Sequence, residues 1–194
     1  MQKSRLEAFS DGVFAIIITI MVLELKVPHG VELADLRPLL PVLLSYVLSF
    51  IYLGIYWNNH HHMFHATRRV SGGILWANLH LLFWLSLFPF ATAWIGENHV
   101  APVPTALYGV VLFMAGVAYY LLQYKIISRH GRDSDLAKAI GTDWKGKFSP
   151  VGYLLGIALA FINPWISNGL YVLVALLWLV PDPRIERYLE QRES

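Results

Sequence analysis

Long apolar runs separated by short polar segments dominate this chain of 194 residues. Six runs come close to the roughly 20 residues that a helix needs to cross a bilayer. We expect membrane-spanning helices at about 8–27, 36–58, 74–96, 103–127, 149–165 and 167–181. Little sequence is left over for a soluble domain, so the pattern predicts one six-helix unit over residues 1–194.

The first run differs from the others because it carries polar groups inside an apolar helix. Asp11 and Thr19 lie among branched aliphatic residues, and such groups are expensive in hydrocarbon and mark functional sites. At 100° per residue, Asp11 falls about 140° from Ile16. The residues within about 60° of Ile16 form a stripe that only one hydroxyl interrupts: Gly12, Thr19, Ile20, Leu23 and Val27. We interpret the stripe as a pore wall and expect Asp11 to bond to other helices.

Composition and charge agree with a membrane protein. Hydrophobic residues make up 56% of the chain and charged residues only 14%, as in integral membrane proteins. Between the six runs, Lys26 and Arg37 lie on one side, and the remaining thirteen of the 15 lysines and arginines lie on the other. The positive-inside rule therefore predicts that both termini are cytoplasmic. The basic residues surround no groove-binding motif, so we expect no nucleic-acid partner.

Two further patterns concern the helix at 149–165. Small residues at intervals of four predict a face that lets another backbone approach closely: Gly152, Gly156 and Ala160. Ser149 followed by Pro150 is typical of a helix start, with serine as the N-cap and proline in the first turn.

Histidines suggest a metal site that the rest of the sequence does not support. His61 and His65 lie one turn apart on a helix, beside His60 and His62, but two ligands do not make a zinc site. The chain has no cysteine. We therefore expect no bound metal, and a pH-sensing role stays open. Because no hydrolase elbow, phosphate loop or HExxH element is present, the sequence does not predict an enzyme.

The partners of Ser10 and Asp11 should come from helices at the same depth. We expect them among the polar residues at the cytoplasmic ends of the second and third helices: Asn58, Asn59, Asn78 and His80. Arg5 either neutralises Asp11 or lies at the mouth of the pore.

A motif at the start of the chain carries a family resemblance. Arg5, three further residues and then Phe9-Ser10-Asp11 continue as GVFAIIIT into the first apolar run. This RxxxFSD pattern, in a six-helix context, resembles the bacterial members of the transmembrane protein 175 potassium-channel family. The resemblance implies a homotetramer in the bacterial inner membrane, with the first helix of each subunit lining a central pore. Like those channels, the chain has no TVGYG filter.

The resemblance also implies roles for single residues. Ile16 would form the narrowest hydrophobic ring, Thr19 a hydroxyl ring above it, and Ile20 or Leu23 the next layers outward. Potassium would be the permeant ion, with no bound cofactor. A proton-leak or proton-coupled transporter that works through Asp11 and His80 is the alternative, although the two halves of the chain show no likeness to each other. A membrane scaffold that conducts no ions is the third functional hypothesis.

Overall fold

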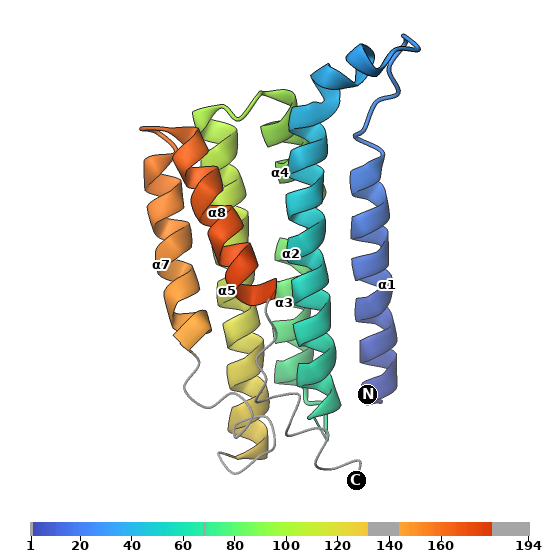
Figure 1. Cartoon of the computed structure of the whole chain (residues 1–194). Coiled ribbons are helices and arrows are strands. Elements are labelled where there is room, and N and C mark those ends of the chain that lie inside the picture. Colours follow the sequence, from blue (N-terminus) through green and yellow to red (C-terminus); the bar gives the residue numbers. More distant parts are fainter. Residues whose placement is uncertain (1, 68, 132–143, 180–194) are drawn as a thin grey trace.

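A computed structural model describes residues 2–67, 69–131 and 144–179, and within these ranges the chain is helical without strands. Figure 1 shows the elements in chain order. They are α1 (Lys3–Val22), the 3-10 segment η1 (Leu33–Leu39), α2 (Leu40–His65), α3 (Gly72–Ser86), α4 (Phe88–Glu97), α5 (Pro102–His130), α7 (Trp144–Leu159) and α8 (Pro164–Leu179).

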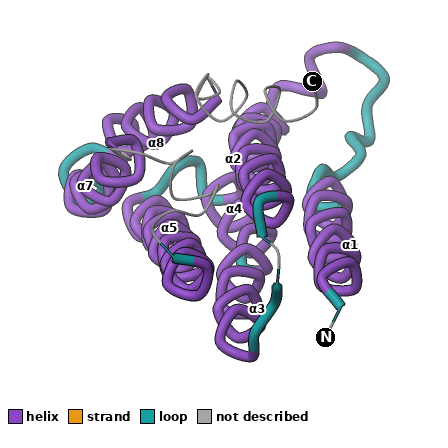
Figure 2. The backbone as a smooth tube through the Cα atoms, turned by 90° about the horizontal axis from the view of Figure 1, so that it is seen from below, coloured by secondary structure: helices purple, strands orange, loops and turns teal. Residues whose placement is uncertain are grey.

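The helices stand side by side in a bundle with α1 at one edge. Figure 2 shows α1 beside α2 and α3, with α5 further in and with α7 and α8 at the opposite edge. Three stretches are long and apolar enough to cross a membrane, namely Leu33–His65, Gly72–Glu97 and Pro102–His130, and α8 is a shorter apolar helix. The all-helical fold expected from the sequence is confirmed.

Proline divides the third predicted span. The run at 74–96 forms α3 and α4, which follow each other in one column behind α2 in Figure 1. Leu87 separates the two helices, and Pro89 lies in the first turn of α4. Because proline has no N–H to bond to the carbonyl four residues earlier, it interrupts a helix at this point.

The ends of other helices differ from the predicted spans. α1 covers Lys3–Val22 rather than 8–27, so Leu23 caps the helix and Val27 lies beyond it. α7 includes Ser149 and Pro150 within the helix, so the predicted helix start at Ser149 is wrong. The Ser149 hydroxyl donates backward to the Lys145 carbonyl at 2.7 Å, which is the alternative bond that serine makes inside helices.

The small-residue face predicted for 149–165 is present on α7. A Cβ atom on Gly156 would collide with the ring of Tyr171, and one on Gly152 would lie 3.0 Å from Val174. Both contacts come from α8, so the glycines allow α7 and α8 to pack closely.

Candidate functional site

The first helix has one buried face and one uncovered face. Its buried face consists of Leu6, Ser10, Phe14, Ile17 and Met21, which pack against the rest of the subunit. The exposed stripe, by which we mean Gly12, Ile16, Thr19, Ile20 and Leu23, lies on the opposite side. Ile16 is 57% exposed and Leu23 is 76% exposed. Large aliphatic side chains are thus uncovered along the predicted pore wall within one subunit.

The hydroxyl in the exposed stripe is oriented by its own helix. Thr19 Oγ1 lies 3.0 Å from the carbonyl oxygens of both Ala15 and Ile16. A threonine hydroxyl has one hydrogen and two acceptor lone pairs. Because the hydrogen is directed at the helix backbone, the lone pairs remain available on the exposed side. A cation or a water molecule in front of this face would meet an acceptor.

A chain of buried polar side chains ties α1 to two other helices. Ser10 donates to the Leu6 carbonyl at 2.9 Å and accepts from Asn78 Nδ2 at 2.9 Å. Asn78 Oδ1 then lies 2.7 Å from His60 Nε2. Since the amide oxygen can only accept, His60 donates from Nε2. Ser10 and Asn78 are fully buried and His60 is 2% exposed, so this Ser10–Asn78–His60 chain joins α1, α3 and α2.

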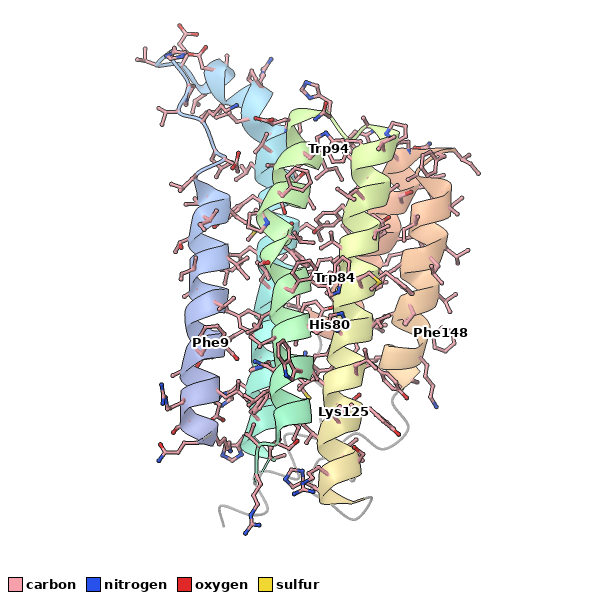
Figure 3. All side chains as sticks on the ribbon, turned by 180° about the vertical axis from the view of Figure 1, so that it is seen from behind. Phe9, His80, Trp84, Trp94, Lys125 and Phe148 are labelled. Atoms are coloured by element: carbon pink, nitrogen blue, oxygen red, sulfur yellow. The ribbon has the colours of Figure 1, made fainter. Side chains whose placement is uncertain are left out.

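Asp11 bonds to a residue that the sequence analysis did not select. Trp57 Nε1 donates to Asp11 Oδ1 at 3.0 Å, and the Trp57 indole stacks on His61 with ring centroids 6.2 Å apart. Among the described residues, Asn59, Asn78 and His80 bond to other groups. Asn59 donates to the Ile55 carbonyl, and His80 accepts from Trp84. Figure 3 labels His80 and Trp84.

Trp57 bonds to α1 directly and His60 bonds to it through Asn78, and neither was predicted as a partner. They lie three residues apart on α2, which places them on neighbouring positions of one helix face. The histidine run at 60–62 suggested a metal site, whereas its first member, His60, is a buried hydrogen-bond donor. In the described part of the chain, no three His, Asp or Glu residues come close enough to hold a metal ion.

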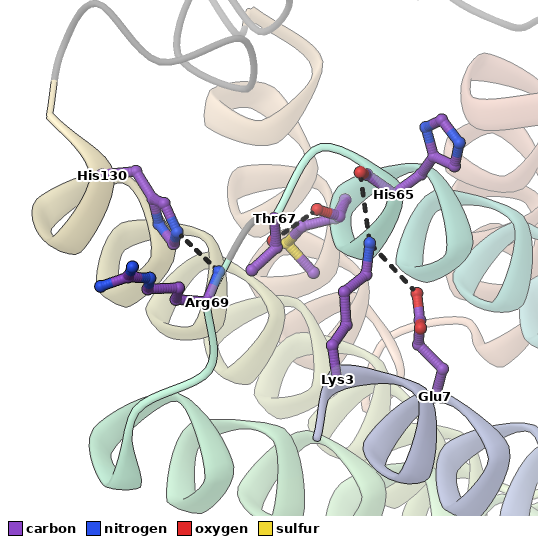
Figure 4. A network of polar contacts seen from close by, with 7 residues as sticks. Lys3, Glu7, His65, Thr67, Arg69 and His130 are labelled. Atoms are coloured by element: carbon purple, nitrogen blue, oxygen red, sulfur yellow. Dashed lines mark hydrogen bonds and ion pairs between the residues drawn. The ribbon is translucent and has the colours of Figure 1, made fainter. Parts of the chain in front are cut away.

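Both ends of α1 are tethered as well. Figure 4 shows the lower end, where Lys3 Nζ lies 3.4 Å from the His65 carbonyl oxygen and 3.7 Å from Glu7 Oε1. Four residues beyond the upper end, Lys26 Nζ lies 2.7 Å from Glu97 Oε1, at the end of α4. This hydrogen bond and the charge of Glu97 raise the pKa of Lys26.

The two remaining motif residues lie on the uncovered side. Phe9 is 52% exposed, and its label in Figure 3 marks it on α1 at the edge of the bundle. Arg5 is exposed near the lower end of the same helix. Neither belongs to the buried chain. Asp11 is exposed as well, although it accepts a bond from Trp57, so Ser10 is the buried residue of the motif.

Taken together, the apolar helices and the anchored first helix with an uncovered stripe define a multi-pass membrane protein of the channel class. A family model described as the endosomal/lysosomal potassium channel TMEM175 matches residues 5–89. The chain is 58% identical over 191 residues to a potassium channel of Chryseobacterium sp. (strain P1-3), covering 98% of this chain and 100% of that protein. The chain belongs to the TMEM175 family, whose members are ion channels and not enzymes.

More distant relatives also extend over nearly the whole chain. A potassium channel of Streptomyces collinus is 32% identical over 202 residues, covering 95% of this chain and 97% of that protein. The crystal structure of a lysosomal potassium-selective channel TMEM175 homolog from Chamaesiphon minutus superposes with a TM-score of 0.79 at 33% identity. That superposition covers 91% of this chain and 95% of the other.

Proposed function

We propose that this protein is a potassium channel in which four copies of α1 surround a central pore. The observation that carries the proposal is the exposed stripe: α1 buries one face in its own subunit and leaves Ile16 57% exposed on the other. One helix cannot enclose a conduit, whereas symmetry-related copies close a ring around an axis. Relatives named as potassium channels over nearly the full chain support potassium as the permeant ion.

The residues of the exposed stripe have distinct roles in this proposal. Ile16 forms the narrowest ring, which gates by excluding water. The Thr19 hydroxyls lie one turn above, where their lone pairs meet an ion that has lost part of its water. Ile20 and Leu23 form the layers further outward, and Arg5 lies at the inner mouth.

The proposed setting is a bacterial inner membrane with both termini in the cytoplasm. The asymmetry of lysine and arginine supports this orientation. The lower end of α1 and the start of α7 lie toward the same end of the bundle in Figure 1, which agrees with a chain that crosses the membrane and returns. Lipids and monovalent cations are then the partners of the homotetramer.

Proton transport through Asp11 and His80 is the competing function. Asp11 bonds to Trp57 and His80 to Trp84, so within the described part of the chain the two groups have no direct link that would pass a proton. The geometry supports the pore over this relay.

The decisive experiment is potassium flux from liposomes that contain purified protein. Ile16→Asn should raise flux because a polar ring wets the constriction. Thr19→Val keeps the shape and removes the hydroxyl, and it should lower the preference for potassium over sodium. Ile18→Val is the matched control because Ile18 packs against the core of its own subunit. If Ile18→Val changes permeation and the other two variants do not, the wrong face has been assigned to the pore.

Assembly gives a second test of the same proposal. Chemical crosslinking of the protein in mild detergent should stop at a four-subunit species. A monomer or dimer that still conducts after reconstitution would contradict the architecture.

A further inference from the structure

A cavity of about 340 Å³ lies inside each subunit, away from α1. Residues of α2, α5, α7 and α8 line it. α7 and α8 have 16 residues each, whereas α2 has 26 and α5 has 29. The shorter pair therefore covers only part of the longer pair, as Figure 1 shows. The cavity lies where α7 begins and α8 ends, with Gly146 and Trp178 in its wall.

The wall of the cavity is mainly aromatic, with polar groups toward one end. Because α2 and α5 run downward and α7 runs upward, Tyr52 and Tyr153 lie at the upper end, and Asn59, Gln123 and Lys147 lie at the lower end. Its volume is near the lower end of the roughly 300–1,000 Å³ of ligand pockets, which typically combine an apolar wall with a few polar groups.

Gln123 supplies a polar group at the lower end of the cavity. Its side chain is only 7% exposed and lines the cavity. Its amide is one of the few polar groups in a wall that is mainly aromatic. This amide can bond to a polar atom of a bound molecule. Asn59 uses its N–H to bond to the Ile55 carbonyl at 2.8 Å, so its amide oxygen is a second point of attachment.

Lys147 gives the lower end of the cavity a positive charge. The residue is exposed and lines the mouth. Its position agrees with the basic side of the protein, where acidic lipids attract lysine and arginine. An occupant that fits all three features has an apolar body for the aromatic wall, a polar group for Gln123 and a negative charge for Lys147.

We propose that the cavity between α2, α5, α7 and α8 binds one acyl chain of an acidic lipid, with its negative headgroup at Lys147 and a polar oxygen at Gln123. The proposal concerns a site separate from the exposed stripe of α1. It therefore does not depend on the pore, and it is tested by binding rather than by ion flux.

The test measures lipid binding to the purified full-length protein by native mass spectrometry in a nonionic detergent. The probes are palmitate, its uncharged methyl ester and palmitoyl-oleoyl phosphatidylglycerol. We expect one bound probe per subunit, and the methyl ester should bind about fivefold or more weakly because it lacks the charge that Lys147 attracts. Binding of palmitate alone assigns the site to a free fatty acid, and binding of phosphatidylglycerol to a phospholipid tail.

Two pairs of variants locate the binding. Gly116→Leu should abolish probe binding because the leucine side chain fills the cavity. The larger side chain has room to enter it, since a Cβ atom at Gly116 meets nothing nearer than Tyr153 and Tyr56 at 3.8 Å. Gly169→Leu is its control, because nothing lies within 4 Å of a Cβ atom at Gly169 on α8. Lys147→Ala should weaken binding about fivefold. Lys125→Ala, an exposed lysine on α5 outside the cavity, should not.

Correct folding is checked with the same samples. Gly116→Ala adds one methyl group at ordinary contact distance. It should weaken probe binding without changing the unfolding temperature. It therefore replaces Gly116→Leu if that variant does not assemble. Gln123→Leu should weaken binding as well. If the Gly116 and Gln123 variants bind palmitate and phosphatidylglycerol as the unmodified protein does, or if no probe binds, the cavity holds only water and the proposal is overturned.

Discussion

Replacing Asn78 by leucine tests the polar chain that anchors the first helix. Asn78 is fully buried and makes two bonds, one to Ser10 on α1 and one to His60 on α2. Leucine has a similar size and bonds to neither. Ser10 keeps its bond to the Leu6 carbonyl, whereas His60 loses the acceptor for its Nε2 proton.

The expected loss of unfolding free energy has two parts, the broken hydrogen bonds and the buried His60 N–H that is left without a partner. Hydrogen bonds between membrane helices average about 0.6 kcal/mol and reach about 1.7 kcal/mol. A buried donor left without a partner costs about 1–3 kcal/mol, so the orphaned His60 is the larger contribution. We expect Asn78→Leu to lower the free energy of unfolding by about 2–4 kcal/mol. Ser10→Ala breaks only one of the two bonds and should cost about 1–2 kcal/mol.

The assay is unfolding of the purified protein in detergent, with the fraction of assembled protein measured in parallel. In the double variant, Ser10→Ala should add little once Asn78 has been replaced, because the shared bond is already lost, giving a coupling of about 1 kcal/mol. Ser86→Ala on the exposed side of α3 is the control and should stay within about 0.5 kcal/mol of the original protein. The reasoning is refuted if the losses of unfolding free energy from Ser10→Ala and Asn78→Leu add up in the double variant. It is also refuted if Asn78→Leu loses less than Ser10→Ala.

Two further substitutions follow from single contacts. Trp57→Phe removes the N–H that bonds to Asp11 but keeps a ring beside His61. It should lower the free energy of unfolding by about 0.5–1.5 kcal/mol. If Trp57→Phe lowers that free energy equally in the original protein and in the Asp11→Leu variant, the pairing is contradicted. Gly156→Ala places a methyl group against the Tyr171 ring and should cost about 1–3 kcal/mol in thermal unfolding, whereas Gly54→Ala, with nothing within 4 Å, should be neutral or stabilising.

The helices could be predicted from the sequence because their signals are local. Run length and hydrophobicity belong to one continuous segment, and so does the angular position of Ile16 and Thr19 on α1. The division of 74–96 also had a local cause in Pro89, which the run-length criterion ignored. Helix ends were less accurate. Ser149 followed by Pro150 has the pattern of a helix start, but the serine hydroxyl bonds within the helix instead.

The partners of Ser10 and Asp11 were only half predictable. Asn78 was correctly expected to contact the motif, because polar residues at one depth tend to meet inside a bundle. The choice of Trp57 for Asp11 and of His60 for Asn78 depends on how far α2 is rotated about its axis and shifted along it. That rotation results from packing over the whole helix, and no short stretch of sequence encodes it.

The buried chain matters for the proposed pore because it fixes the rotation of α1. Valine, leucine and isoleucine pack almost equally well against lipid, a neighbouring helix or a central axis, so apolar contacts alone leave the rotation of such a helix poorly defined. Ser10 accepts the bond that the buried amide of Asn78 donates. Moving the sequence of α1 along the helix by one residue would turn its side chains by about 100° and break that contact. The same shift would carry Ile16 and Thr19 away from the side on which they are now uncovered. The hydrogen bonds of the motif thus determine which side chains a pore formed by α1 would present to an ion.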